Sequence, residues 1–358
     1  MPWGPDQADA LQAFNATTPL PNQEDSSMKT YDLYAIGNAL MDSEYEVSDT
    51  QLQAMGVDKR HMTLINAARC SELLDHLTAS TARRTGGGSA GNTVVALAQL
   101  GGRAFYSCRV ADDELGAFYT QDLIANGVAT NLTRTLPAPG QTGSCMVMVT
   151  PDAERSKSTF LGATAELDHT ALHHQDIAQS KIYYMEGYLA ASSTGLQAAF
   201  QGRQMAQDAA VALATTLSDV SMINFCRPGL EAIIGQGLDY LFCNEEEAQV
   251  WCGSQDIKQI CQQISPLART VCLTRGPQVC LVLEGKQQTA VPAVRVQALD
   301  TNGAGDMFAG AFLNAVTHGE SHPQAAWLAN QAAGLVVSQY GNRLTPEILG
   351  RIKGRAEA

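Results

Sequence analysis

Strand-like and helix-like segments alternate along most of this chain of 358 residues. Residues 31–38 and 104–110 form apolar runs typical of buried strands, and an amphipathic run at 93–100 lies between them. The alternation resumes at residue 181 and continues almost to the end of the chain. Because parallel strands of one sheet need a crossover helix between them, the pattern predicts an α/β fold. We expect a doubly wound, mostly parallel sheet with helices on both faces.

A strand hairpin interrupts the alternation. Residues 143–150 and 156–161 are both strand-like, and a short polar turn joins them. Polar and apolar residues also alternate through residues 39–47, around Asp42, which indicates a strand that leaves the main core at the start of the segment 42–65. Together the two regions, about 42–66 and 141–164, predict a small β-rich lid over a binding site.

The two ends of the chain differ in composition from the rest. Residues 1–30 are rich in polar residues and proline, so we expect a flexible extension, and Met28 is a candidate for the natural start. Residues 31–350 form the predicted domain, with the lid inserted in it, and residues 351–358 form a short tail.

Composition restricts the classes of partner. The net charge of −13 and the pI near 4.9 argue against nucleic acid and anionic membranes, which both attract clusters of Lys and Arg. Nine cysteines lack any C-x-x-C pair, as expected for a reduced protein of the cytoplasm. No apolar stretch reaches the length needed to cross a membrane, so neither membrane insertion nor secretion is predicted.

The segment 300–306, Asp-Thr-Asn-Gly-Ala-Gly-Asp, carries the strongest chemical signal. It follows a strand-like run at 289–299 and precedes a helical run. Small residues at 303–305 leave the backbone N–H groups open at a helix start, where anions bind. Asp306 in the same turn would repel an anion, so we interpret it as a base beside a phosphoryl-binding turn. An ordinary glycine-rich turn capped by an acid is the alternative.

A second glycine-rich segment, 86–91, fits two familiar patterns. It contains G-x-G-x-x-G, typical of dinucleotide binding, and G-x-S-x-G, typical of a nucleophilic serine. Both patterns require an apolar strand directly upstream, and residues 78–85 are polar and basic. A dehydrogenase and a hydrolase are therefore both disfavoured.

These motifs resemble those of the PfkB, or ribokinase-like, family of carbohydrate and nucleoside kinases. The segment 300–312 is similar to the C-terminal signature of the family, D-T-x-G-A-G-D. The segment 87–92, followed by an Ala-rich helix and L-G-G, resembles the N-terminal signature. The segment 37–42, G-N-x-x-x-D, resembles that of adenosine kinases and their relatives. The resemblance extends from residue 31 to about 350 and implies a ribokinase-like fold with a small β lid.

For catalysis the resemblance implies that Asp306 is the base and that Gly303, Ala304 and Gly305 form the anion hole. For the substrate it implies a set of sugar-binding residues, whose carboxylate accepts two vicinal hydroxyl groups and whose glycines allow close approach of the backbone. These residues are Asp42, Gly87, Gly88, Asn92 and, from the turn of the hairpin, Arg155. An exposed turn residue is the alternative for Arg155.

For the nucleotide the resemblance implies that ATP binds near four residues: Asn244, Thr274, Gly276 and Asn330. Asn244 and Glu247 match the N-x-x-E of the family, so Glu247 is expected near Mg²⁺, acting through water, although a helix-capping pair has the same pattern. Asp300 is a candidate ligand of a monovalent cation such as K⁺.

We therefore expect an ATP-dependent kinase that phosphorylates the hydroxymethyl group of a ribose-containing substrate, with adenosine as the first choice. A kinase of ribose, fructose or a related sugar is the second interpretation. A catalytically silent sugar- or nucleotide-binding protein is the alternative from another class. An edge of the lid could also pair with a second subunit and form a homodimer.

Overall fold

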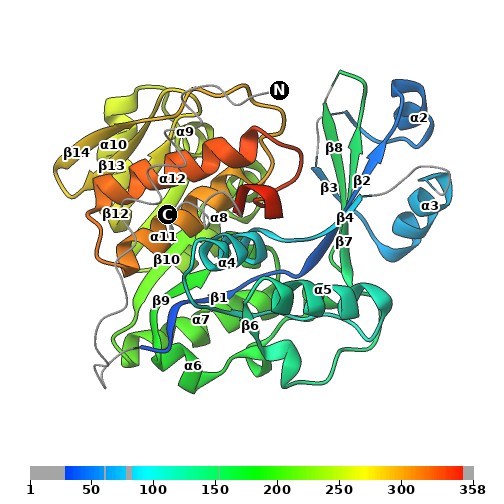
Figure 1. The fold of residues 1–358 in the computed structure, drawn as a ribbon, viewed down its shortest axis with the longest axis horizontal. Coiled ribbons are helices and arrows are strands. Elements are labelled where there is room, and N and C mark those ends of the chain that lie inside the picture. Colours follow the sequence, from blue (N-terminus) through cyan, green and yellow to red (C-terminus); the bar gives the residue numbers. More distant parts are fainter. Residues whose placement is uncertain (1–28, 60–61, 78–82, 153, 350–358) are drawn as a thin grey trace.

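The computed structural model describes residues 29–349 except 60, 61, 78–82 and 153. The predicted N-terminal extension, apart from its last two residues, and the predicted tail lie outside the described residues. Two sheets form the framework (Figure 1). The larger has nine strands in the order β14-β13-β12-β11-β10-β9-β1-β5-β6, and the smaller has five in the order β3-β8-β7-β2-β4.

The large sheet is parallel from β6 to β12, and only β13 and β14 run antiparallel to their neighbours. Its strands are β1 (Tyr31–Ile36), β5 (Ala104–Ser107), β6 (Ala129–Thr130), β9 (Ser180–Met185), β10 (Ala212–Thr216), β11 (Leu238–Asn244), β12 (Ala268–Thr274), β13 (Val279–Glu284) and β14 (Gln287–Pro292). The predicted parallel order is therefore observed, with two antiparallel strands added at one edge.

Helices cover both faces of the large sheet, as expected from the alternation (Figure 1). One face carries α4 (Ser89–Gln99), α5 (Glu114–Ala125), α11 (Ala304–Thr317) and α12 (His322–Val337). The other carries α6 (His174–Ala178), α7 (Ser193–Asp208), α8 (Val220–Ile234), α9 (Glu245–Cys252) and α10 (Ile257–Ile264). Side chains of one strand alternate between the faces: in β1, Leu33 packs into the first core and Tyr34 into the second.

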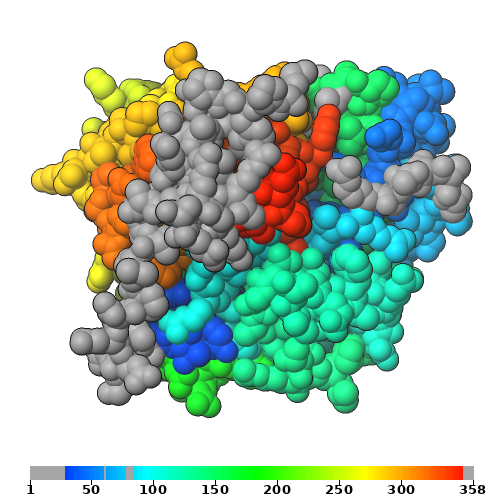
Figure 2. Space-filling model, in the orientation of Figure 1, coloured from blue at the N-terminus to red at the C-terminus, as the bar shows by residue number. Residues whose placement is uncertain are grey.

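The small sheet lies beside the large domain, where the C-terminal residues drawn in red come next to it (Figures 1 and 2). Its strands are β2 (Leu40–Glu46), β3 (Met62–Leu64), β4 (Arg83–Gly87), β7 (Gly143–Val149) and β8 (Arg155–Phe160). The antiparallel pair β7–β8 is the predicted hairpin. Two helices, α2 (Asp49–Ala54) and α3 (Ala67–Leu77), pack against one face of this sheet and form a separate core with it.

One expectation about a single strand was wrong, and one strand was not predicted. The run 289–299 was predicted as one strand, but β14 ends at Pro292, which has no N–H to continue a ladder. Beyond it the chain packs along α12, where Leu299 N donates to Val337 O at 2.7 Å. Conversely, the polar segment before the second glycine motif does form a strand, β4, which pairs with β2 of the small sheet. It is still not the apolar, core strand that a dinucleotide or nucleophilic-serine motif needs.

Within the described residues, no helix is both long and apolar enough to cross a membrane.

Candidate active site

Polar residues lie at or just beyond the carboxyl ends of four neighbouring parallel strands of the large sheet. Asn38 follows β1, Glu186 follows β9, Asp219 comes after β10, and Asn244 ends β11. The carboxyl ends of parallel strands meet at one edge, which is where ligands bind in open α/β sheets. A cavity of about 540 Å³ opens there, between this edge, the small sheet and the start of α11.

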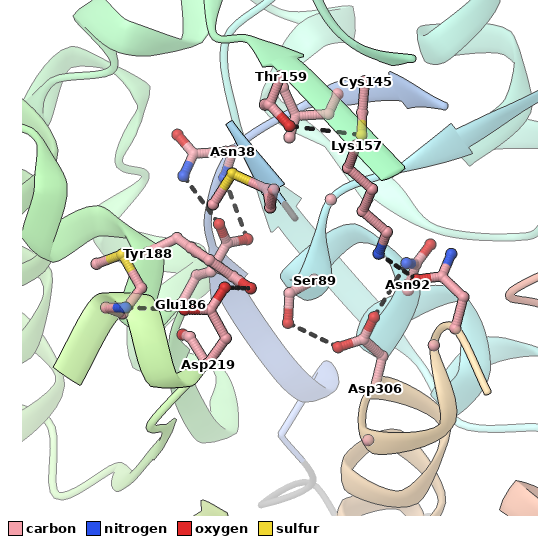
Figure 3. A pocket seen from close by; sticks show the side chains of 18 of the residues that line it. Asn38, Ser89, Asn92, Cys145, Lys157, Thr159, Glu186, Tyr188, Asp219 and Asp306 are labelled. Carbon is pink, nitrogen blue, oxygen red and sulfur yellow. Dashed lines mark hydrogen bonds between the residues drawn. The ribbon is translucent and has the colours of Figure 1, made fainter. Parts of the chain in front are cut away.

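Charged side chains line the cavity from both parts of the molecule (Figure 3). They are Asp42, Arg155, Lys157, Glu186, Asp219, Glu247 and Asp306. Five of these side chains are acids and two are bases, so the cavity has a negative electrostatic potential. An anionic ligand such as ATP would need N–H groups and a cation to offset this potential.

Asp306 lies in the first turn of α11 and points into the cavity (Figure 3). Ser89 Oγ donates to its Oδ1 at 2.7 Å, and Asn92 Nδ2 donates to its Oδ2 at 3.0 Å. Burial raises the pKa of the Asp306 carboxyl, whereas these two hydrogen bonds and the charges of Lys157 and Arg343 lower it. A carboxylate held in this way can accept a proton from a hydroxyl group.

The glycine turn before Asp306 also lines the cavity. Gly303 is the N-cap of α11 with φ of +75°, a conformation that favours glycine, and an added Cβ would lie 2.6 Å from Asn342 Cβ. The helix begins at Ala304, whose N–H donates to Thr301 O at 3.3 Å. The start of a helix generally leaves its other first N–H groups without an intrahelical partner. At Gly305 an added Cβ would meet nothing within 4 Å, so the space above the turn is open. The arrangement suits an anion.

Asp42 lines the same cavity from β2 of the small sheet. Gly87 in the paired strand leaves room for its carboxyl group, because an added Cβ would lie 2.4 Å from that group. Gly88 has φ of +83°, and an added Cβ would lie 2.1 Å from Asn38 O. Burial raises the pKa of Asp42 to about 6, and Asn342 Nδ2 donates to its Oδ2 at 3.1 Å.

Glu186 lines the cavity and is almost completely buried, with 1% of its surface exposed. It accepts hydrogen bonds from Asn38 Nδ2 at 2.8 Å and from Ala90 N at 2.9 Å, so it joins the end of β1 to the start of α4. Burial raises its pKa to about 7. This residue fixes the backbone that carries Asn38 and Ser89.

Asn244 and Glu247 form a capping box at the start of α9 and also line the cavity. Glu247 N donates to Asn244 Oδ1 at 2.8 Å, and Asn244 Nδ2 donates to Glu247 Oε1 at 2.6 Å. Burial raises the pKa of Glu247 to about 7. Asn244 and Glu247 thus form the helix-capping pair that was the alternative, and they also line the cavity.

Thr274, Gly276 and Asn330 do not line this cavity. Thr274 ends β12 opposite Asn244, and its hydroxyl donates to Cys243 O at 3.4 Å. Asn330 is buried in α12, where its amide donates to Pro292 O at 3.0 Å. This hydrogen bond connects α12 to the end of β14.

Arg155 and Asp300, which we had assigned to substrate and to a cation, contact each other. Arg155 Nη2 lies 2.9 Å from Asp300 Oδ2 and 2.8 Å from Glu44 Oε1. Arg155 is the first residue of β8 and is mostly buried, so the alternative of an exposed turn residue was wrong.

Several residues of the cavity were not predicted: Asn38, Ser89, Lys157, Glu186 and Asp219. Three of them come just after parallel strands, and that position alone could have identified them. Lys157 had no such signal. It reaches in from β8, and its Nζ donates to Asn302 Oδ1 at 2.7 Å, next to the glycine turn (Figure 3).

Comparisons with known proteins agree on one family. The pfkB family carbohydrate kinase pattern matches residues 61–348. A probable sugar kinase of Rhizobium etli CFN 42 is 31% identical, with a TM-score of 0.84, over 92% of this chain and 100% of its own. The adenosine kinase of Sinorhizobium meliloti is 34% identical, with a TM-score of 0.82, over 92% and 99%. Adenosine kinase of Saccharomyces cerevisiae is 25% identical over 87% of this chain and 96% of its own.

Proposed function

The chain belongs to the pfkB family of carbohydrate kinases, and within it we propose that adenosine is the substrate. The predicted ribokinase-like fold is confirmed by the two similar bacterial structures. The protein is an ATP-dependent phosphotransferase with an alcohol group as acceptor, as predicted. The choice among nucleosides and sugars is the part that we propose.

One observation supports the choice of a nucleoside: beside its polar lining residues, which include Asp42, Lys157 and Thr159, the small sheet presents a set of apolar side chains to the cavity. This apolar wall consists of Leu40, Met62, Leu64, Val147 and, just after the sheet, Leu161. Sugars such as ribose or fructose expose hydroxyl groups in all directions and gain little from such a wall. A purine has flat apolar faces that the wall would cover, while its ribose would face the polar floor.

In this proposal Asp42 accepts hydrogen bonds from two vicinal ribose hydroxyl groups, and Asn92 and the Gly87–Gly88 backbone hold the ring beside it. The hydroxymethyl group then lies near Asp306. Asp306 takes its proton as the oxygen forms a bond to the γ-phosphorus of ATP and the bond to ADP breaks. The N–H groups at Gly303–Gly305 stabilise the negative charge on the transferred group.

Mg²⁺ fits the residues at the nucleotide end of the cavity. Within the described ranges no three His, Cys, Asp or Glu side chains cluster to enclose a metal ion. Mg²⁺ commonly takes most of its ligands from phosphates and water, so Asp219 and Glu247 would hold it through water. When bound, it offsets the charge of the phosphates. Thr274, Gly276 and Asn330 stay predictions for the rest of the nucleotide.

We further propose that the small sheet closes over the substrate as a lid. Its outer face is already covered by α2 and α3. A homodimer through the lid would therefore have to use its edge strands, β3 or β4. The dimer and a cytoplasmic location stay predictions.

The test is an assay of ADP release with ATP and Mg²⁺ on adenosine, inosine, guanosine, ribose and fructose. We expect turnover on adenosine, and a loss of about 10²- to 10⁴-fold in kcat for Asp306→Asn with adenosine binding retained. Asp208→Asn, on the exposed part of α7, is the matched control. Faster turnover on ribose or fructose would favour the sugar kinase. Tight binding of one ligand without any turnover would favour the silent binder.

A further inference from the structure

A buried ion pair ties the small sheet to the segment that leads into the glycine turn. The Asp300 side chain is 0% exposed and lies 2.9 Å from Arg155 Nη2 through its Oδ2. The same Nη2 lies 2.8 Å from Glu44 Oε1, on the neighbouring part of the small sheet. One guanidinium group therefore stands between two carboxylates, one from each part of the molecule.

The oxygens of Asp300 also accept two backbone hydrogen bonds. Oδ1 accepts from Asn302 N at 2.9 Å, and Oδ2 accepts from Gly341 N at 2.9 Å as well as from Arg155. Three donors thus converge on one carboxylate that is closed to solvent. A buried carboxylate requires compensating positive charge, and here the guanidinium supplies it.

This geometry does not fit the monovalent cation that we had expected at Asp300. A K⁺ ion against the carboxylate would replace N–H donors that are already in place. It would also stand next to the guanidinium, where two like charges repel strongly in a buried setting. We propose that Arg155 takes the position of a monovalent cation beside Asp300, and that this protein works without K⁺.

Arg155 then acts as a positioning residue. Asp300 Oδ1 orients the N–H of Asn302, and the next residue, Gly303, begins the turn that would bind the phosphoryl group. While the Asp300 carboxylate stays paired with Arg155, it keeps its hydrogen bond to Asn302 N and so holds the glycine turn in position. Because Arg155 belongs to β8, its contribution to holding the turn is present only while the small sheet lies against the large domain, whereas the bonds from Asn302 N and Gly341 N do not involve the small sheet.

The test compares KCl with choline chloride at equal ionic strength, with two readouts. For the wild type we expect the same unfolding temperature and the same kcat/KM for adenosine in both salts. A specific increase of either quantity with KCl would overturn the proposal. Only the kinetic readout rests on the proposed function. If no substrate turns over, the unfolding temperature still tests Arg155.

Arg155→Ala removes the guanidinium and leaves space beside a buried carboxylate. We expect its unfolding temperature to fall by roughly 5 °C or more, and KCl but not choline chloride to restore part of the loss. In the double variant Arg155→Ala/Asp300→Asn, KCl should no longer raise the unfolding temperature. Arg269→Ala, whose side chain is 86% exposed and pairs with Asp239, is the control that should not respond. If the unfolding temperature of Arg155→Ala were the same in KCl and in choline chloride, the proposal would be contradicted. If this variant does not fold, the wild-type comparison decides alone.

Discussion

Ser89 Oγ donates a 2.7 Å hydrogen bond to Asp306 Oδ1. Ser89 is the first residue of α4 and Asp306 lies in the first turn of α11, so the contact joins the starts of two packed helices. Asn92, one turn further along α4, holds the other oxygen. The orientation of the proposed base therefore depends on the N-terminal signature as well as on its own turn.

Ser89→Ala is expected to shift the acidic limb of the pH dependence of kcat/KM to higher pH. The base must be ionised, so activity falls as the pH drops through the pKa of Asp306. The hydrogen bond from Ser89 lowers this pKa, and its removal raises it. The measurement is kcat/KM for adenosine across the acidic range. Ser265→Ala, whose hydroxyl donates to Gly285 O away from the cavity, is the control. An unchanged limb would mean that Ser89 does not act on the base.

Glu186→Gln is expected to flatten the pH dependence of stability. The folded-state pKa of about 7 exceeds the ordinary 4.5, so the folded protein binds this proton more tightly than the unfolded chain. The contribution of Glu186 to the free energy of unfolding is complete below about pH 4.5. It is lost as the pH rises through 7, which lowers the free energy of unfolding by roughly 3 kcal/mol. Urea unfolding of the two proteins at several pH values would measure it. Glu166→Gln, an exposed acid, should keep the wild-type slope. An equal slope in Glu186→Gln would contradict the assignment.

Gly87→Ala is expected to weaken nucleoside binding more than ATP binding. The new Cβ would lie 2.4 Å from the Asp42 carboxyl and would displace it. Loss of hydrogen bonds to a charged group predicts a rise of about 10- to 100-fold in KM for adenosine. Gly334→Ala in α12 is the matched control, since its Cβ would have an ordinary contact of 3.4 Å with Val294. If both substrates lost affinity equally, the effect would be one of folding.

Local sequence pattern predicted the large sheet well, because buried parallel strands and their helices have their own periodicities. It failed where pairing is decided by distant residues. β4 is polar and becomes a strand only because β2 lies beside it. The run after Pro292 is apolar enough for a strand, yet its side chains pack on α12. Neither outcome is encoded within the segment itself.

The same distinction applies to the site. Motif spacing identified Asp306, Asp42 and Asn92, and the structure gathers all three around one cavity. Glu186 was missed although it directly follows a strand, where position in the sheet could have identified it. Lys157 could not be identified locally, because the register of β7 with β8 and the tilt of the small sheet decide where it points.

Lys157 gives the last prediction. Its Nζ is bound to Asn302 beside the proposed anion hole, and its charge lowers the pKa of both Asp306 and Asp42. Lys157→Met should reduce kcat by about 100-fold, since a fixed charge next to the developing negative charge is lost, with little change in KM for adenosine. The acidic limb of kcat/KM should also move to higher pH.

Lys258→Met, on the exposed side of α10, controls for the loss of a lysine as such and should match the wild type. Lys157→Arg keeps the charge and should recover part of kcat. If Lys157→Met raised KM for adenosine but left kcat unchanged, the lysine would bind the substrate without contributing to phosphoryl transfer. The small sheet would then act as a cover for the nucleoside and would supply no charge to the reaction.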